Sequence, residues 1–257
     1  MSGLFDLSGR VALVTGGSRG LGLEIARTFG RSGAKLAISA RKPDELEAAR
    51  AELAADGFEV EAFRADLGDM AAAEPLAQAV IDRFRQIDVL VNNAGATWGA
   101  PAESHPHDAW RKVLAVNLDS VFALTQAVAA KSMLPRGTGS VIIVASVAGM
   151  GGSPAPFATP AYNASKAGAI NLARALATEW GRRGVRVNAL CPGWFPTKMS
   201  RGTLSTFEQA FLNHIPMGRF GDPAHEIGGP ALFLASDASR YMTGVVLAVD
   251  GGITALS

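Results

Sequence analysis

The stretch "VALVTGGSRGLGLEIA" at residues 11–26 decides the fold class, because it passes from an apolar strand through a glycine-rich turn into a helix. Glycines at positions 16, 17, 20 and 22 leave backbone N–H groups open at the start of that helix, where the helix dipole favours an anion. Such a unit typically binds the pyrophosphate of a dinucleotide, although a tight turn also uses glycine for structural reasons alone. The stretch therefore predicts a dinucleotide-binding α/β domain.

The rest of the chain continues the alternation of strand and helix. Apolar runs predict strands at 10–15, 35–40, 59–65, 87–93, 139–146, 185–191 and 244–250. Several of these runs are apolar throughout, which is typical of strands covered on both faces. We expect a Rossmann-type, doubly wound parallel sheet of about seven strands with helices on both faces, built as a single domain over 1–257 with a substrate lid around 194–216.

Composition narrows the class of protein further. The chain has 257 residues, 48% of them hydrophobic, and a net charge of +1, which suits one large domain and argues against a nucleic-acid partner. Cys191 is the single cysteine, so an intrachain disulfide is excluded. We find no signal peptide and no apolar run that looks long enough to cross a membrane. These features predict a cytoplasmic protein without a membrane partner.

Two local clusters have a plain structural interpretation. Arg182, Arg183 and Arg186 follow a helical run, and we interpret them as favourable charge at a helix C-terminus. His105 and His107 lack further clustered ligands around them, so we predict no metal site.

The turn reads Thr-Gly-x-x-x-Gly-x-Gly at Thr15, Gly16, Gly20 and Gly22. In this motif the chain resembles the short-chain dehydrogenase/reductase family, in its shorter single-domain branch, and later motifs extend the resemblance over essentially the whole chain. The resemblance implies a nicotinamide dinucleotide as the cofactor. The implied cofactor-binding residues are Gly16, Ser18, Arg19, Gly20, Leu21, Gly22, Arg41, Asp66, Leu67, Asn93, Ala94, Gly95, Tyr162, Lys166, Pro192, Gly193, Phe195 and Thr197.

The end of the second predicted strand discriminates between the two nicotinamide cofactors. An NAD enzyme places a carboxylate there for the ribose 2′-hydroxyl, but this chain has Ala40 at that position, followed by Arg41. Arg19 adds a second guanidinium inside the glycine turn, and arginines favour a 2′-phosphate. The sequence therefore predicts a preference for NADP(H) over NAD(H), the alternative being two solvated arginines.

Candidate catalytic residues lie in and around "AYNASK" at 161–166. Tyr162 and Lys166 share one helix face, and a nearby ammonium is expected to lower the pKa of a phenol from its usual value near 10. The phenol can then exchange a proton with a carbonyl or alcohol oxygen, which Ser146 can also hold by a hydrogen bond.

The family resemblance completes this catalytic set. It implies that Lys166 also binds the nicotinamide ribose and that Asn117, in the preceding long helix, completes a proton relay through water. Taken singly, Asn117 could satisfy backbone groups in a buried helix, and Ser146 could merely end a strand. We predict that Asn117, Ser146, Tyr162 and Lys166 act together.

The expected substrate pocket is mostly apolar. Its candidate residues are Trp98, Met150, Phe157, Trp194 and Met199, with the segment 200–216. The Gly- and Pro-rich loop 149–160 is expected to shape one wall. These side chains could equally pack a lid against the core.

Three functions fit these features, and a spectrophotometric screen separates them. An apolar pocket favours reduction of a ketone such as a 3-oxoacyl thioester, and "PGWFPTKM" at 192–199 resembles β-ketoacyl reductases of the rhamnolipid type. The opening "LFDLSGRVALVTGGSRGLG" at 4–22 instead resembles gluconate 5-dehydrogenases, which leaves a polyol or sugar-acid dehydrogenase as the alternative. A non-catalytic NADP(H)-binding sensor is the third. The resemblance also implies a homo-oligomer, a tetramer or dimer, through helices 106–134 and 160–182.

Overall fold

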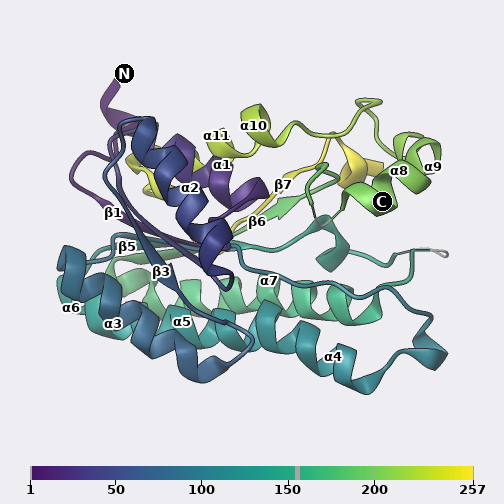
Figure 1. Ribbon diagram of the computed structural model, residues 1–257, viewed down its shortest axis with the longest axis horizontal. Helices are drawn as coiled ribbons and strands as arrows, with labels where there is room; N and C mark the ends of the chain where they lie inside the picture. The colour runs from purple at the N-terminus through teal and green to yellow at the C-terminus, as the bar shows by residue number, and fades with distance from the viewer. Residues whose placement is uncertain (1, 154–156, 199, 257) are drawn as a thin grey trace.

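The computed structural model describes residues 2–153, 157–198 and 200–256, and within them seven strands form a parallel sheet in the order β3-β2-β1-β4-β5-β6-β7 (Figure 1). The strands are β1 Val11–Thr15, β2 Lys35–Ala40, β3 Val60–Arg64, β4 Val89–Asn92, β5 Gly139–Val144, β6 Val185–Pro192 and β7 Val246–Val249. The predicted fold class is confirmed. The order reverses between β1 and β4, so the carboxyl ends of these two strands flank the crevice where doubly wound sheets bind ligands.

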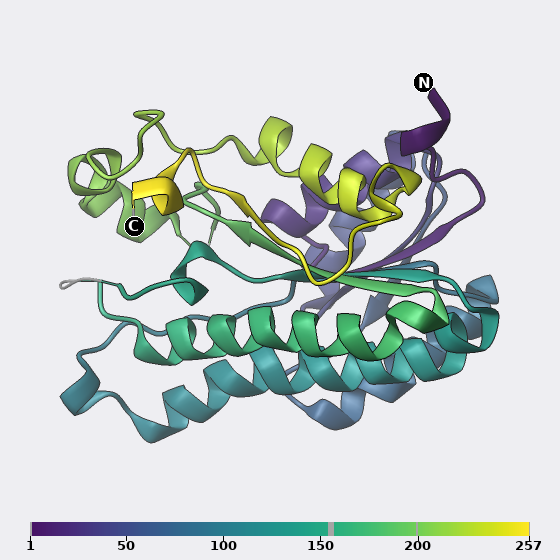
Figure 2. The same cartoon turned by 180° about the vertical axis from the view of Figure 1, so that it is seen from behind.

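Helices cover both faces of this sheet. They are α1 Gly20–Arg31, α2 Pro43–Ala55, α3 Ala73–Phe84, α4 His107–Leu114, α5 Ser120–Val128, α6 Leu134–Arg136, α7 Pro160–Trp180, α8 Arg201–Thr206, α9 Glu208–Leu212, α10 Pro223–Glu226 and α11 Gly228–Ala235. Figures 1 and 2 show α1, α2 and α11 on one face and α3, α5 and α7 on the other. Each layer has its own apolar core, which explains why the strands are apolar throughout.

The predicted long helix at 106–134 is not a regular α-helix. Residues Ala115–Asp119 and Ala129–Met133 form π-helical turns between α4, α5 and α6, and π-turns of this kind often occur at functional sites. The continuous stretch His107–Arg136 is long and apolar enough, by length and composition only, to cross a membrane. The prediction that the chain has no run of that length was therefore wrong, but α4 and α5 pack here against α7 and α3 as core helices of the sheet layer.

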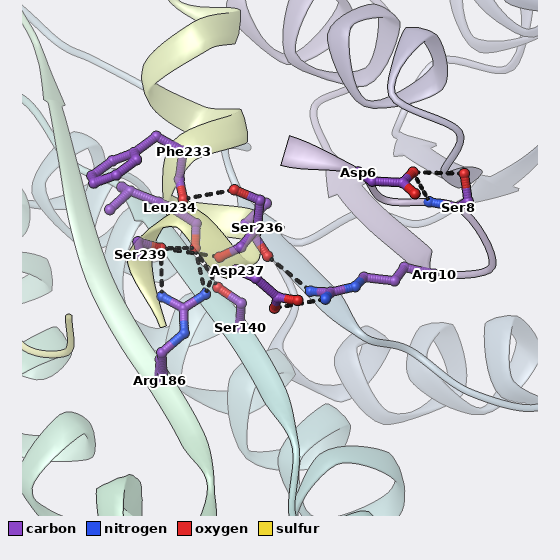
Figure 3. A network of polar contacts seen from close by, with 11 residues as sticks. Asp6, Ser8, Arg10, Ser140, Arg186, Phe233, Leu234, Ser236, Asp237 and Ser239 are labelled. Carbon is purple, nitrogen blue, oxygen red and sulfur yellow. Dashed lines mark hydrogen bonds and ion pairs between the residues drawn. The ribbon is translucent and has the colours of Figure 1, made fainter. Parts of the chain in front are cut away.

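Arg186 lies at the amino end of β6, away from the crevice, where it binds the end of α11 (Figure 3). Its guanidinium donates to the carbonyl oxygen of Leu234 at 2.8 Å and to Ser239 Oγ at 2.9 Å. Ser140 Oγ in β5 donates to the same Leu234 carbonyl at 2.9 Å. The expectation was thus wrong for Arg186, because its guanidinium binds carbonyl oxygens at and just after the C-terminus of α11 rather than at the end of the helix that precedes it.

Candidate active site

The glycine turn, residues 15–22, is braced from β4. Thr15 Oγ1 accepts hydrogen bonds from the backbone N–H groups of Asn93 and Ala94, both at 3.0 Å. Asn93 Nδ2 donates to the carbonyl oxygen of Thr15 at 2.9 Å. Gly16 has a φ of +64°, and a Cβ on Gly22 would come within 2.3 Å of Asn93 Nδ2, so both positions require glycine.

The turn leaves an open anion site at the start of α1. Arg19 is the N-cap of this helix and makes no side-chain capping bond, so the first-turn N–H groups of Gly20, Leu21 and Gly22 have no acceptor within the helix. An uncapped, twelve-residue helix with glycines at its entrance suits a pyrophosphate. The residues present therefore fit the dinucleotide that the sequence implies.

The expected adenosine end of the crevice lies beyond β2 and β3. Arg41 is exposed directly after β2, and Leu67 is buried below the surface. Asp66 is exposed after β3, where its Oδ1 accepts a hydrogen bond from Gly68 N at 3.0 Å. Glu45 also lies at this end, a residue that the sequence patterns did not single out.

The four candidate catalytic side chains come from three neighbouring elements. Asn117 lies in the first π-turn, where Nδ2 donates to Ser165 Oγ and to the carbonyl oxygen of Ala96, both at 2.9 Å. Lys166 is 5% exposed, and its Nζ donates to the carbonyl oxygen of Val144 at 2.8 Å. Asn117 and Lys166 both approach Gly95, since Oδ1 and Nζ would lie 3.4 Å and 3.8 Å from a Cβ placed there. The π-turn thus turns Asn117 toward the lysine.

Burial dominates the electrostatics of the Tyr162–Lys166 pair. It raises the pKa of the Tyr162 phenol, while the hydrogen bond from Ser146 acts in the opposite sense. Burial also lowers the pKa of Lys166 to about 8. The pKa of the phenol is therefore raised, not lowered as expected, because desolvation is the largest cause and outweighs the hydrogen bond from Ser146. The Lys166 Nζ lies over the ring, 5.6 Å from its centroid.

Cys191 is a neighbour of this pair that the sequence did not place there. It is fully buried in β6, and burial raises the pKa of its thiol to about 11. The thiol therefore stays neutral near pH 7 and adds no negative charge beside Lys166.

The loop between Ser146 and Tyr162 is held from within α7. Asn163 Nδ2 donates to the carbonyl oxygens of Ala148 and Gly151 at 2.8 Å and 3.0 Å. Thr159 Oγ1 donates to Asn163 Oδ1 at 2.9 Å. Because Asn163 is next to Tyr162, the amide fixes Ala148, Gly151 and Thr159 relative to the candidate catalytic residue.

An aromatic cluster forms the side of the site nearest the lid. We define it as Phe157, Trp194, Phe207 and Phe211. Phe211 lies between Phe157 and Trp194, with its ring centroid 4.3 Å from that of Phe157 and 4.2 Å from that of Trp194, and Phe207 packs edge-on against Phe157 at 4.8 Å. Phe207 and Phe211 belong to the predicted lid range, but no sequence signal distinguished them from its other residues.

The remaining pocket candidates are Trp98, Met150 and Met199. The side chains of Trp98 and Met150 are 46% and 48% exposed. The backbone N–H of Ala100, in the loop after Trp98, donates a hydrogen bond of 3.1 Å to the carbonyl oxygen of Ala158, the residue that follows Phe157 of the aromatic cluster. Met199 lies outside the described residues.

The segment that follows β6 crosses the crevice. Gly193 N donates to the carbonyl oxygen of Val249 at 2.9 Å, next to the buried residues Pro192 and Phe195. Thr197 lies over the glycine turn, 3.5 Å from where a Cβ on Gly20 would be. The segment therefore runs from the expected nicotinamide end toward the pyrophosphate turn.

His105 and His107 line a cavity together with Trp110 and Pro160, the first residue of α7. The His105 ring stands edge-on to Trp110 at a centroid distance of 6.2 Å. Across the part of the chain that the structure describes, no group of three or more His, Cys, Asp or Glu side chains is arranged to hold a metal ion.

A doubly wound parallel sheet with a glycine-rich turn after β1, where the strand order reverses, is typical of dinucleotide-binding proteins. Residues 16–254 match a family model described as enoyl-(acyl carrier protein) reductase. The chain belongs to the short-chain dehydrogenase/reductase family and is an oxidoreductase that acts on CH–OH or C=O groups.

Named relatives span more than one substrate class. A gluconate 5-dehydrogenase of Gluconobacter oxydans is 38% identical over 98% of this chain and 97% of the relative. A rhamnolipids biosynthesis 3-oxoacyl-[acyl-carrier-protein] reductase of Pseudomonas aeruginosa is 40% identical over 96% and 97%. The solved gluconate 5-dehydrogenase of Burkholderia cenocepacia, in complex with NADP and tartrate, has a TM-score of 0.93 at 34% identity, covering 99% of this chain and 98% of that one.

Proposed function

We propose that this protein is an NADPH-dependent reductase that converts an apolar ketone, such as a 3-oxoacyl thioester, to a secondary alcohol in the cytoplasm. NADPH held across the crevice would supply the hydride for the carbonyl carbon. The observation that carries the proposal is the half-buried Tyr162 with the buried Lys166 over its ring, beside the uncapped, glycine-rich start of α1. A relative crystallised with NADP supports the cofactor.

Each catalytic side chain has a distinct task in this proposal. The neutral phenol of Tyr162 donates its proton to the carbonyl oxygen, and its raised pKa keeps it protonated near pH 7. Ser146 donates a hydrogen bond to the same oxygen and stabilises the charge that develops there. The ammonium of Lys166 stabilises the phenolate left behind. Asn117 orders the path by which the proton is replaced from solvent.

The aromatic cluster supports an apolar substrate. Two rings of the lid, Phe207 and Phe211, pack on Phe157, which belongs to the loop leading to Tyr162. Lys198, which could have given the pocket positive charge, instead forms an ion pair with Glu45 at the adenosine end. We expect the segment around 194–216 to close over an acyl chain rather than over a sugar acid.

A spectrophotometric screen of NADPH consumption tests the substrate class. The panel contains 3-oxoacyl thioesters, diketones and keto-sugars, and the reverse reactions are assayed with NADP⁺ and polyols or sugar acids. We expect the highest kcat/KM with the apolar ketones. A clear preference for 5-ketogluconate or a polyol would reject the acyl assignment in favour of the alternative, which the gluconate 5-dehydrogenase relatives favour.

The exposed Arg41 gives a direct test of cofactor preference. We expect Arg41→Gln to raise the KM for NADPH roughly tenfold, because a guanidinium–phosphate contact is lost, and to leave the KM for NADH within about twofold. Arg31→Gln, at the exposed C-terminal end of α1, serves as the control. A wild-type enzyme that prefers NADH in side-by-side kinetics would contradict the assignment.

We also propose a homo-oligomer built through the long helices. Trp110 and Phe122 project from the α4–α5 stretch with 38% and 40% of their surface exposed, and a second copy of the chain would cover them. The molar mass measured by light scattering at micromolar concentration distinguishes a dimer or tetramer from a monomer.

A further inference from the structure

The carboxylate of Glu45, in the first turn of α2, is shared by three cations. Arg19 Nη1 lies 2.5 Å from Oε2, while Lys42 Nζ and Lys198 Nζ lie 3.3 Å and 3.2 Å from Oε1. The hydrogen bond from Lys198 is the largest cause that holds the pKa of Glu45 below its ordinary value. The ionised carboxylate of Glu45 therefore lies between three cations, Arg19, Lys42 and Lys198, at the expected adenosine end of the crevice.

Lys198 reaches this carboxylate from the far side of the crevice. Ser200 Oγ accepts a hydrogen bond from Thr197 N at 2.9 Å and donates to the carbonyl oxygen of Phe195 at 2.6 Å. This compact turn places Thr197 over the glycine turn, so that the next side chain, Lys198, extends to α2. The contact between Lys198 and Glu45 thus bridges the segment after β6 and the first turn of α2.

These ion pairs are suited to exchange. The side chains of Lys42 and Lys198 are 57% and 68% exposed, and that of Glu45 is 29% exposed. Exposed pairs of this kind contribute little to stability, so a stronger anion can replace the carboxylate at small cost. A phosphate monoester carries nearly two charges at pH 7 and three acceptor oxygens, whereas a hydroxyl carries no charge.

We propose that Lys198 is a cofactor-specificity residue, and that Glu45 is an internal anion which the 2′-phosphate of NADP(H) displaces. The phosphate takes over Lys198 together with Arg19 and Lys42. NAD(H) lacks the phosphate and leaves Glu45 in place. This inference rests on the proposed preference for NADP(H), which it explains with residues from both sides of the crevice.

Equilibrium binding of NADP⁺ and NAD⁺ to the full chain tests this role without any substrate. We expect Lys198→Gln to raise the Kd for NADP⁺ roughly fivefold and to leave the Kd for NAD⁺ within about twofold. Glu45→Gln removes the competing anion, so the Kd for NADP⁺ should fall roughly threefold. The control is Glu59→Gln, which breaks a comparable pair with Lys35, 3.0 Å apart, at the amino end of β2.

The double variant Lys198→Gln/Glu45→Gln distinguishes a direct contact of Lys198 with the phosphate from an ion pair that only holds the segment after β6 against α2. If Lys198 meets the phosphate, Lys198→Gln still raises the Kd for NADP⁺ in the Glu45→Gln background. An unchanged Kd in that background, or equal losses for NADP⁺ and NAD⁺, would overturn the proposal. Tighter binding of NAD⁺ than NADP⁺ by the wild type is a separate result, because it rejects the proposed cofactor preference itself.

Discussion

Tyr162→Phe should lower kcat for ketone reduction by roughly 10²-fold or more, because the variant lacks the proton that the carbonyl oxygen receives. The ring remains, so the packing around it and the position of Lys166 over it should persist. Binding of NADPH, measured by fluorescence titration, should therefore stay within about threefold of the wild type.

The chain provides a matched control for this variant. Tyr241 is the second of its two tyrosines and is fully exposed, so Tyr241→Phe removes the same hydroxyl far from the crevice. Its kcat should equal that of the wild type. Undiminished turnover in Tyr162→Phe would show that another group supplies the proton.

Lys166→Met should cause a second loss of roughly 10²-fold or more in kcat, since no ammonium then stabilises the phenolate. The wild-type rate of reduction should also fall as the pH rises through about 8, the pKa of Lys166, because the charged form is the active one. The pH–rate profile of the variant should lack this step. Initial rates between pH 6 and 9.5, with saturating NADPH, measure both effects.

The same substitution should not destabilise the protein. The folded state holds the Lys166 proton less tightly than the unfolded chain, so this group costs stability below pH 8, and the cost fades as the pH rises from about 8 to 10.5. At neutral pH the cost is on the order of 3 kcal/mol, part of which the hydrogen bond to Val144 offsets. We expect the Tm of Lys166→Met to equal or exceed that of Lys35→Met, the exposed control. If the Tm of Lys166→Met is lower than that of Lys35→Met, the loss of activity is explained by unfolding and not by the missing ammonium.

The parallel sheet explains why the sequence predicts which segments meet at the candidate site. The motifs after β1, β4, β5 and β6 are distant in the chain, but parallel strands bring their carboxyl ends to one edge. Thr15 and Asn93, for example, meet directly through hydrogen bonds. A strand pattern and a motif at its end therefore suffice to place such residues.

Other features depend on packing that no local pattern encodes. Lys198 and Glu45 are 153 positions apart, on segments whose approach is set by the turn after β6. The π-turn at Asn117 and the packing of Phe211 between Phe157 and Trp194 likewise follow from tertiary contacts. The direction of the pKa shift of Tyr162 was mispredicted because burial, which the sequence does not show, is the largest cause of the shift and raises the pKa.

Single-turnover reduction with NADPH deuterated at C4 of the nicotinamide tests the central claim most directly. With the best ketone from the substrate screen, the wild type should place the label on the carbinol carbon, and Tyr162→Phe should do so at least about 10²-fold more slowly with the cofactor still bound. Transfer at the wild-type rate by Tyr162→Phe, or a product without label at that carbon, would contradict the account.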